Sequence, residues 1–196
     1  MALLFGSKLA LQGSWDRRVL PQGRLGISLV PQERYYAFGN GYKRATRKFL
    51  DDLENHIEPG MTVLDIGTGV GVLAIAAVKL GAGHVIALEP GDAGHIYAPQ
   101  NFRINRVEDK VSLMKGWYPE VFLPRADLVL ANLDVIETLE YMMLDHIGPK
   151  MIVMPSLEDM LRFDANANHH KWFKTKTIPD GVEYNYIVLE ETEARI

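Results

Sequence analysis

The chain alternates between apolar runs of strand length and longer segments with helical spacing, and this alternation limits the fold more than any other feature. Each run is almost entirely apolar, as a strand buried on both faces must be. Strands that alternate with helices pair in parallel, because each helix returns the chain to the level where the next strand starts. The alternation therefore predicts an α/β fold with a mostly parallel sheet. We expect strands at Thr62–Ile66, His84–Leu88, Lys110–Met114, Asp127–Ala131 and Met151–Met154, and helices at Tyr42–Ile57, Val72–Leu80, Ala93–Asn105, Ile136–His146 and Leu157–Asp164.

The two ends of the chain depart from this alternation. Residues 1–34 combine short apolar runs with glycine and proline turn signals, which indicates a hairpin or an irregular arm. Near the other end, Trp172–Ile178 and Tyr184–Leu189 flank the turn Pro179-Asp180-Gly181 and predict a C-terminal antiparallel hairpin. We therefore expect an N-terminal arm over residues 1–34 and one domain over residues 35–196.

Length and composition exclude several classes of protein. A chain of 196 residues suits one domain, and its 47% hydrophobic and 23% charged residues are ordinary for a globular protein. No apolar stretch approaches the roughly 18 residues that a membrane-spanning helix needs. The chain has no cysteine, and its first residues lack the layout of a signal peptide. We expect a soluble, cytoplasmic protein with no membrane partner.

Positive charge is concentrated near the start of the chain. The first 50 residues hold nine Lys and Arg residues against two acids, Asp16 and Glu33, although the formal net charge of the whole chain is -4. Clustered positive charge attracts phosphates or an acidic protein surface. A solvated basic surface without a partner is the plainer interpretation, and both remain open at this point.

A glycine-rich turn joins the first buried strand to the helix that follows it. Residues 63–71 read Val-Leu-Asp-Ile-Gly-Thr-Gly-Val-Gly, and such glycines let the backbone turn tightly and a ligand approach closely. The spacing is G-x-G-x-G, whereas the dinucleotide fingerprint G-x-G-x-x-G requires a glycine at position 72, where this chain has Val72. The turn also lacks the Gly-Lys-Ser/Thr ending of a phosphate loop. Nicotinamide enzymes, flavin enzymes and nucleotide triphosphatases are therefore disfavoured.

Two acidic residues accompany the turn. Asp65 lies just before it, where the carboxylate can hold amides of the loop or reach the ammonium group of a cofactor through water. Glu89 ends the next strand at the carboxyl edge of the sheet, where a nucleoside ribose lies in folds of this kind. A carboxylate offers paired acceptors to two ribose hydroxyls. For Asp65 the alternative is a role in bracing the loop alone, and for Glu89 it is a surface charge.

These residues and the order of the strands and helices resemble the first motifs of the class I S-adenosylmethionine-dependent methyltransferases, over about Tyr35 to Leu133. The resemblance implies a Rossmann-like fold with a mostly parallel, seven-stranded sheet and S-adenosylmethionine as the cofactor. Ala37-Phe38-Gly39-Asn40-Gly41 resembles the A-F-G-x-G loop of the bacterial methyltransferases that modify the eleventh protein of the large ribosomal subunit. Ala131-Asn132-Leu133 is similar to the A-N-I tripeptide of the same family.

The sequence also departs from the pattern of that family. The family's loop continues with His-Pro-Thr-Thr, whereas residues 42–46 read Tyr-Lys-Arg-Ala-Thr, so that only Thr46 corresponds. The family carries a separate N-terminal domain that recruits the substrate, and only about 35 residues precede the loop here. The expectation from this sequence therefore stops short of the ribosomal substrate.

The resemblance assigns roles to residues around the cofactor. The loop 37–41 would cover its methionine end. Trp117 can pack on the adenine ring, with a backbone amide near Gly116 at the edge of the ring, or it can be an ordinary partly buried tryptophan. The cofactor-binding residues that we expect are Phe38, Gly39, Asn40, Gly41, Thr46, Asp65, Gly67, Thr68, Gly69, Gly71, Glu89, Pro90, Gly116, Trp117 and Asn132.

Methyl transfer needs alignment more than it needs reactive side chains. It is an in-line displacement at an activated carbon, so the enzyme mainly positions the nucleophile and excludes water, and no metal is required. We expect Asn132 and Asp134 to be catalytic. The side-chain carbonyl of Asn132 can accept a hydrogen bond from an amine and so direct its lone pair at the methyl group. Asp134 can attract the amine or take its proton, or it can simply cap the next helix.

The predicted function is S-adenosylmethionine-dependent methylation of nitrogen in a protein side chain or a small molecule. One alternative is an RNA methyltransferase, which the basic arm favours, but residues 132–135 read Asn-Leu-Asp-Val where amino-group nucleic-acid methyltransferases have N-P-P-Y/F. Another is a non-catalytic cofactor-binding scaffold, against which the intact glycine turn and Glu89 argue. The sequence does not predict the oligomeric state.

Overall fold

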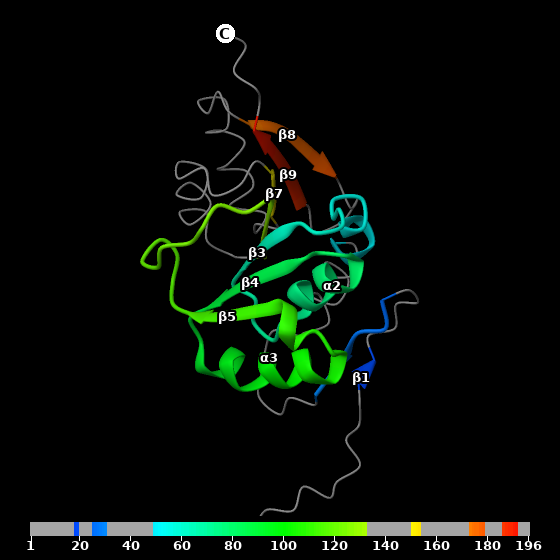
Figure 1. The fold of residues 1–196 in the computed structure, drawn as a ribbon. Helices are drawn as coiled ribbons and strands as arrows, with labels where there is room; N and C mark the ends of the chain where they lie inside the picture. The colour runs from blue at the N-terminus through cyan, green and yellow to red at the C-terminus, as the bar shows by residue number, and fades with distance from the viewer. Residues whose placement is uncertain are drawn as a thin grey trace, which may run out of the picture.

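The computed structural model describes residues 18–19, 25–30, 49–132, 150–153, 173–178 and 186–191, and these residues form a seven-stranded sheet and a small two-stranded one (Figure 1). The strands of the large sheet are β3 (Thr62–Ile66), β4 (His84–Glu89), β5 (Val111–Lys115), β6 (Leu128–Ala131), β7 (Lys150–Val153), β8 (Phe173–Ile178) and β9 (Tyr186–Glu191). Their order in space is β5-β4-β3-β6-β7-β9-β8.

The strand order reverses at β3. From β3 the chain proceeds outward through β4 to β5, then returns to the other side of β3 to form β6 and β7, and all of these neighbours pair in parallel. β9 pairs antiparallel with both β7 and β8. The predicted α/β fold with a mostly parallel sheet is confirmed. In sheets of this kind ligands bind outside the carboxyl ends of the strands at the point of reversal, here between β3 and β6.

Two helices accompany β3, β4 and β5 (Figure 1). They are α2 (Val72–Leu80) and α3 (Asp92–Asn105). α2 is apolar on nearly all sides, and its residues 72–77 are buried, which places it between the sheet and the rest of the core. α3 carries more polar residues and contacts β5 on one side and the N-terminal arm on the other.

Most predicted boundaries hold within one residue, and β3 and α2 begin and end where the sequence predicts. Lys110 was expected in a strand, but it closes the short 3-10 helix η2 (Glu108–Lys110), because its amide donates to the carbonyl of Val107. Asp127 was also expected in a strand. It precedes β6 and is tied to Thr62 by its backbone amide and by its carboxylate, at 2.9 and 2.7 Å.

The helix that precedes the sheet ends earlier than predicted. Residues 49–53 are helical, and residues 54–56 form a turn in place of the expected continuation to Ile57. In this turn the carboxylate of Asp52 accepts a hydrogen bond from Asn55 and contacts the ring of His56 at 2.7 Å. The backbone amides of Asn55 and His56 donate to the carbonyls of Asp52 and Leu53, three residues back, as in the tightened last turn of many helices. The expected helices 136–146 and 157–164 and the turn 179–181 lie outside the described residues.

Part of the predicted N-terminal arm is built into the core. β1 (Arg18–Val19) and β2 (Ser28–Leu29) pair antiparallel as a small sheet. Ile27 and Leu29 are buried in the same apolar cluster as α2 and β3. Among the described residues, no helix is long and apolar enough to span a membrane.

We expect Leu130→Ala to lower the free energy of unfolding by about 2–5 kcal/mol, because Leu130 is fully buried in β6 between two paired strands and the substitution leaves a cavity. Denaturation in urea followed by circular dichroism measures this change. Ile104→Ala, on the exposed side of α3, is the matched control and should change it by less than about 1 kcal/mol. Equal losses in the two variants would contradict the core described above.

Candidate functional site

The glycine turn folds back onto β4. Gly67, Gly69 and Gly71 have φ angles of 73°, 57° and 88°, in the left-handed region where residues with a side chain are strained. The amides of Gly67 and Thr68 both donate to the carbonyl of Leu88, at 2.8 and 3.0 Å. The glycines therefore allow the chain to leave β3, bond to the end of β4 and enter α2 within a few residues.

Asp65 braces this turn from inside the protein. Its carboxylate is only 1% exposed, and Oδ2 accepts hydrogen bonds from the hydroxyl of Thr68 at 2.5 Å and from the amide of Ala74 at 3.0 Å. These bonds connect the end of β3 with the turn and with the first turn of α2. The other oxygen, Oδ1, is buried without a hydrogen-bond partner among the described residues. The bracing role is thus present, and one acceptor remains for a further donor.

The buried position also changes the acidity of Asp65. Burial raises its pKa from 3.8 to about 6, because the charged form loses its hydration, while the hydrogen bonds from Thr68 and Ala74 act in the opposite direction and the charge of Glu89 adds to the increase. Near neutral pH this site therefore holds a buried negative charge. A cationic group placed against Oδ1 would stabilise that charge and lower the pKa.

Glu89 holds the turn from the side of β4. It is 6% exposed, and its two carboxylate oxygens accept hydrogen bonds from the amides of Gly69 and Gly91, at 2.8 and 2.7 Å. Glu89 is thus an internal brace as well as the predicted ribose acceptor. Because each carboxylate oxygen has two lone pairs, both oxygens can still accept a hydroxyl.

Gly94, where α3 meets Glu89 and the glycine turn, is a residue that the sequence patterns did not single out. It lies in the first turns of α3, and a Cβ atom at this position would meet Cγ of Glu89 and the carbonyl oxygen of Gly69, the latter at 2.8 Å. Only a glycine lets α3 approach the turn so closely. A signal was available, because a glycine inside a helical pattern costs about 1 kcal/mol and often marks a close contact.

Strand β6 brings Asn132 to the same edge of the sheet. β6 pairs with β3 so that Ala131 lies opposite Ile66, and the half-buried Asn132 directly follows the end of β6. The carboxyl ends of three adjacent strands therefore carry Asp65, Glu89 and Asn132, as the positions of these residues in the chain predict. Pro90, also half-buried, directly follows Glu89.

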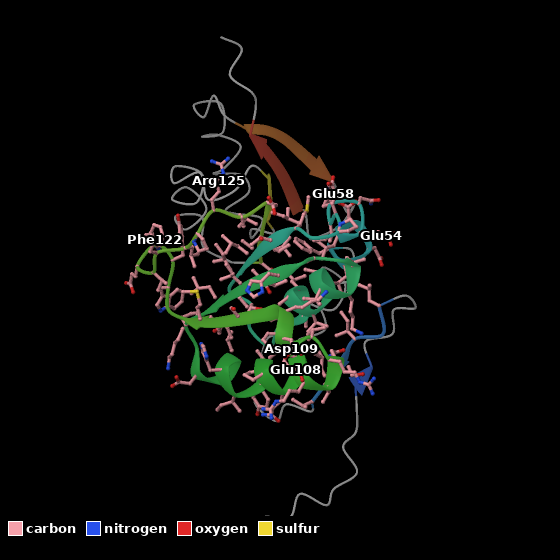
Figure 2. All side chains as sticks on the ribbon, in the orientation of Figure 1. Glu54, Glu58, Glu108, Asp109, Phe122 and Arg125 are labelled. Carbon is pink, nitrogen blue, oxygen red and sulfur yellow. The ribbon has the colours of Figure 1, made fainter. Side chains whose placement is uncertain are left out.

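The loop that follows β5 is more exposed to solvent than the ends of β3 and β4. The amide of Gly116 donates to the carbonyl of Glu89 at 3.3 Å and so helps to hold the edge of the sheet. Trp117 is 58% exposed and Phe122 is 91% exposed. Figure 2 shows Phe122 on one side of the molecule and Glu54 and Glu58 on the opposite side. The exposed aromatic residues thus lie in the loop after β5.

The remaining predicted residues of the site are not described. Phe38, Gly39, Asn40, Gly41, Thr46 and Asp134 lie outside the described residues. Within the part of the chain that the structure describes, no group of three histidines or acids is placed to hold a metal ion.

An exposed ion pair joins the ends of β5 and α3. Lys115 Nζ donates a hydrogen bond to the carboxylate of Asp92, and this bond and the positive charge of Lys115 lower the pKa of Asp92.

We expect the stability of the protein to depend on pH through Asp65. Because its folded pKa lies above the unfolded value, its contribution is full below about pH 4 and is lost as pH rises through about 6, a loss of about 3 kcal/mol. Asp65→Asn cannot ionise and should not show this loss. Unfolding in urea between pH 4 and pH 8 measures both proteins, and parallel curves for the two would contradict the buried charge.

Comparison with known proteins extends these observations. The family described as ribosomal protein L11 methyltransferase (PrmA) matches residues 3–190. The ribosomal protein L11 methyltransferase of Desulfitobacterium hafniense is 42% identical over 194 residues, which are 96% of this chain and 56% of that protein. That of Pelotomaculum thermopropionicum is 41% identical over 133 residues, which are 67% and 42% of the two chains. The chain thus spans about half the length of these curated relatives.

Solved structures agree on the fold. A ribosomal protein L11 methylase from Lactobacillus delbrueckii subsp. bulgaricus has a TM-score of 0.68 at 24% identity and covers 80% of this chain and 81% of its own. A putative RNA methyltransferase from Pyrococcus horikoshii has a TM-score of 0.60 at 20% identity, with coverage of 83% and 91%. The Rossmann-like class I methyltransferase fold and the family resemblance are therefore confirmed. The chain belongs to the ribosomal protein L11 methyltransferase (PrmA) family, within the class I methyltransferases that take their methyl group from S-adenosylmethionine.

Proposed function

We propose that this chain binds S-adenosylmethionine at the glycine turn and transfers the methyl group to a nitrogen atom of a protein side chain. The acceptor named for its relatives, ribosomal protein L11, is the first candidate. The observation that carries the proposal is the corner in which Asp65, Glu89 and the amide of Gly69 meet at the point where the strand order reverses.

The groups of this corner fit the parts of the cofactor. S-Adenosylmethionine supplies, when bound, a methyl group activated by its positively charged sulfonium, and it also carries an ammonium group and a ribose. The buried Oδ1 of Asp65 suits a cationic donor, reached directly or through water. The paired oxygens of Glu89 suit the two ribose hydroxyls, and the glycines leave room for the backbone to approach. Trp117 would pack on adenine, and the loop 37–41 with Thr46 would cover the methionine end.

Alignment of the acceptor would fall to residues that follow β6. The bound cofactor would supply the methyl group to the acceptor nitrogen with its sulfur as the leaving group, and residues of this chain would align the nitrogen and take up its proton. Asn132 directly follows β6 at the carboxyl edge of the sheet, where its side-chain carbonyl can accept a hydrogen bond from the amine and direct the lone pair. We assign to Asp134 the attraction of the amine and the removal of its proton. These groups align and orient, which is what a displacement of this kind requires.

We expect the protein to bind S-adenosylmethionine and S-adenosylhomocysteine with dissociation constants in the micromolar range, and Gly69→Arg to weaken both by more than about a hundredfold. An arginine at a φ of 57° is strained, fills the turn and displaces the amide from Glu89. Isothermal titration calorimetry measures the affinities. Ile104→Arg, which places the same charge on the exposed side of α3, should bind as the unmodified protein does. No binding by the unmodified protein would remove the cofactor assignment.

We expect Asn132→Ala to lower kcat by about tenfold to a hundredfold, the effect of one lost hydrogen bond in the transition state, while the affinity for S-adenosylhomocysteine changes little. Transfer of labelled methyl groups to ribosomal protein L11 measures turnover. Asn55→Ala, a substitution of an exposed asparagine in the turn before β3, is the control. Unchanged kcat in Asn132→Ala would show that Asn132 does not orient the amine.

A further inference from the structure

We propose that Asn101 is a positioning residue that couples the segment 25–30 of the N-terminal arm to the glycine turn, so that docking of this segment and binding of the cofactor favour each other. The part of this inference that concerns the cofactor rests on the proposed function. The part that concerns the segment and the turn rests on contacts among described residues alone.

The side-chain amide of Asn101 joins three parts of the protein. Asn101 lies on α3 and is fully buried. Its Oδ1 accepts a hydrogen bond from the amide of Val30 at 2.8 Å, and its Nδ2 donates to the carbonyl of Val70 at 2.8 Å. Val70 lies between two glycines of the turn. One planar amide group thus links the arm, α3 and the turn over a few ångströms.

A second asparagine, one helical turn later, completes the attachment of the arm. Oδ1 of Asn105 accepts from the amide of Ser28 at 3.0 Å, and its Nδ2 donates to the carbonyls of Ser28 and Asn101, at 2.6 and 2.7 Å. Ser28 and Val30 present their backbone groups to the same side, as alternate residues of a strand do. The two side-chain amides therefore take the place of a neighbouring strand.

The other side of the segment faces the core. Ile27 and Leu29 are buried there, alternating with the residues that bond to the asparagines. Segment 25–30 is thus held by apolar side chains and by backbone hydrogen bonds together.

The coupling follows from the burial of Asn101. If Val30 moves away, Oδ1 loses its partner inside the protein, at a cost of about 1–3 kcal/mol unless the amide reorients and releases Val70. The ring of Phe102, the next residue on α3, packs against Gly71 so closely that a Cβ atom there would overlap it. α3 therefore cannot shift without moving the turn. If docking of the segment strengthens the binding of a ligand at the turn, that ligand must favour the docked segment by the same coupling free energy.

Hydrogen exchange measured by mass spectrometry on the full chain tests this coupling. In the unmodified protein, S-adenosylhomocysteine should slow exchange in the peptide that covers residues 25–30. In Asn101→Ala this slowing should disappear, exchange in that peptide should be at least about tenfold faster without ligand, and the affinity for S-adenosylhomocysteine should fall by about five- to tenfold.

Asn105→Ala is the matched control, because it removes bonds to Ser28 but no bond to the turn. In this variant residues 25–30 should exchange faster than in the unmodified protein, yet S-adenosylhomocysteine should still slow their exchange through Asn101. Val30→Pro is a second variant that leaves α3 intact. It removes the backbone donor of residue 30 together with the valine side chain, and Leu29 already lies in a strand, the conformation that a following proline favours. It should lose the response to ligand as Asn101→Ala does.

The outcomes separate this inference from the proposed function. Equal slowing of the segment by S-adenosylhomocysteine in the unmodified protein, Asn101→Ala and Val30→Pro would overturn the coupling and leave cofactor binding intact. If the unmodified protein does not bind the ligand, the proposed function fails, and the coupling is then decided without ligand. Val30→Pro should accelerate exchange at residues 67–71, whereas unchanged exchange there would overturn the inference.

Discussion

The parallel pairing of β3 with β4 on one side and β6 on the other is the constraint on which the site depends. This register aligns the carboxyl ends of three strands, so that Asp65, Glu89 and Asn132 are brought to one edge although they are far apart in the sequence. The chain must then turn sharply after β3 to enter α2, and only glycines with positive φ angles accomplish this. The geometry of the sheet therefore creates both the turn and the polar groups around it.

Two buried carboxylates stabilise that turn, and each is only partly satisfied by the protein. Asp65 uses one oxygen for Thr68 and Ala74, and Glu89 uses both oxygens for amides of Gly69 and Gly91. The same contacts that fold the loop concentrate negative charge where the strand order reverses. A ligand with a cationic group and two hydroxyls would complete the hydrogen bonding, so stability of the loop and affinity for such a ligand have a common origin.

The N-terminal segment belongs to this arrangement through α3. Its apolar side chains join the main core, and the amides of two asparagines receive its backbone. The helix that supports the glycine turn therefore also holds residues 25–30 of the arm. Gly94 and Phe102 bring the same helix into direct contact with the corner of Glu89 and with Gly71. The glycine turn and residues 25–30 of the arm are thus both held by α3.

The sequence by itself determined the order of strands and helices, the limits of β3 and α2, the glycine turn and the family, because apolar periodicity and glycine spacing are local properties of the chain. It also located Glu89 and Asn132, since residues that end parallel strands must share an edge. Only the tertiary structure decided the 3-10 turn at Lys110, the bracing of the glycine turn by Glu89, the need for glycine at position 94, the raised pKa of Asp65 and the double hydrogen bond of Asn101. Each of these depends on which distant groups meet and on how far water is excluded where they meet, and neither is encoded in the spacing of neighbouring residues.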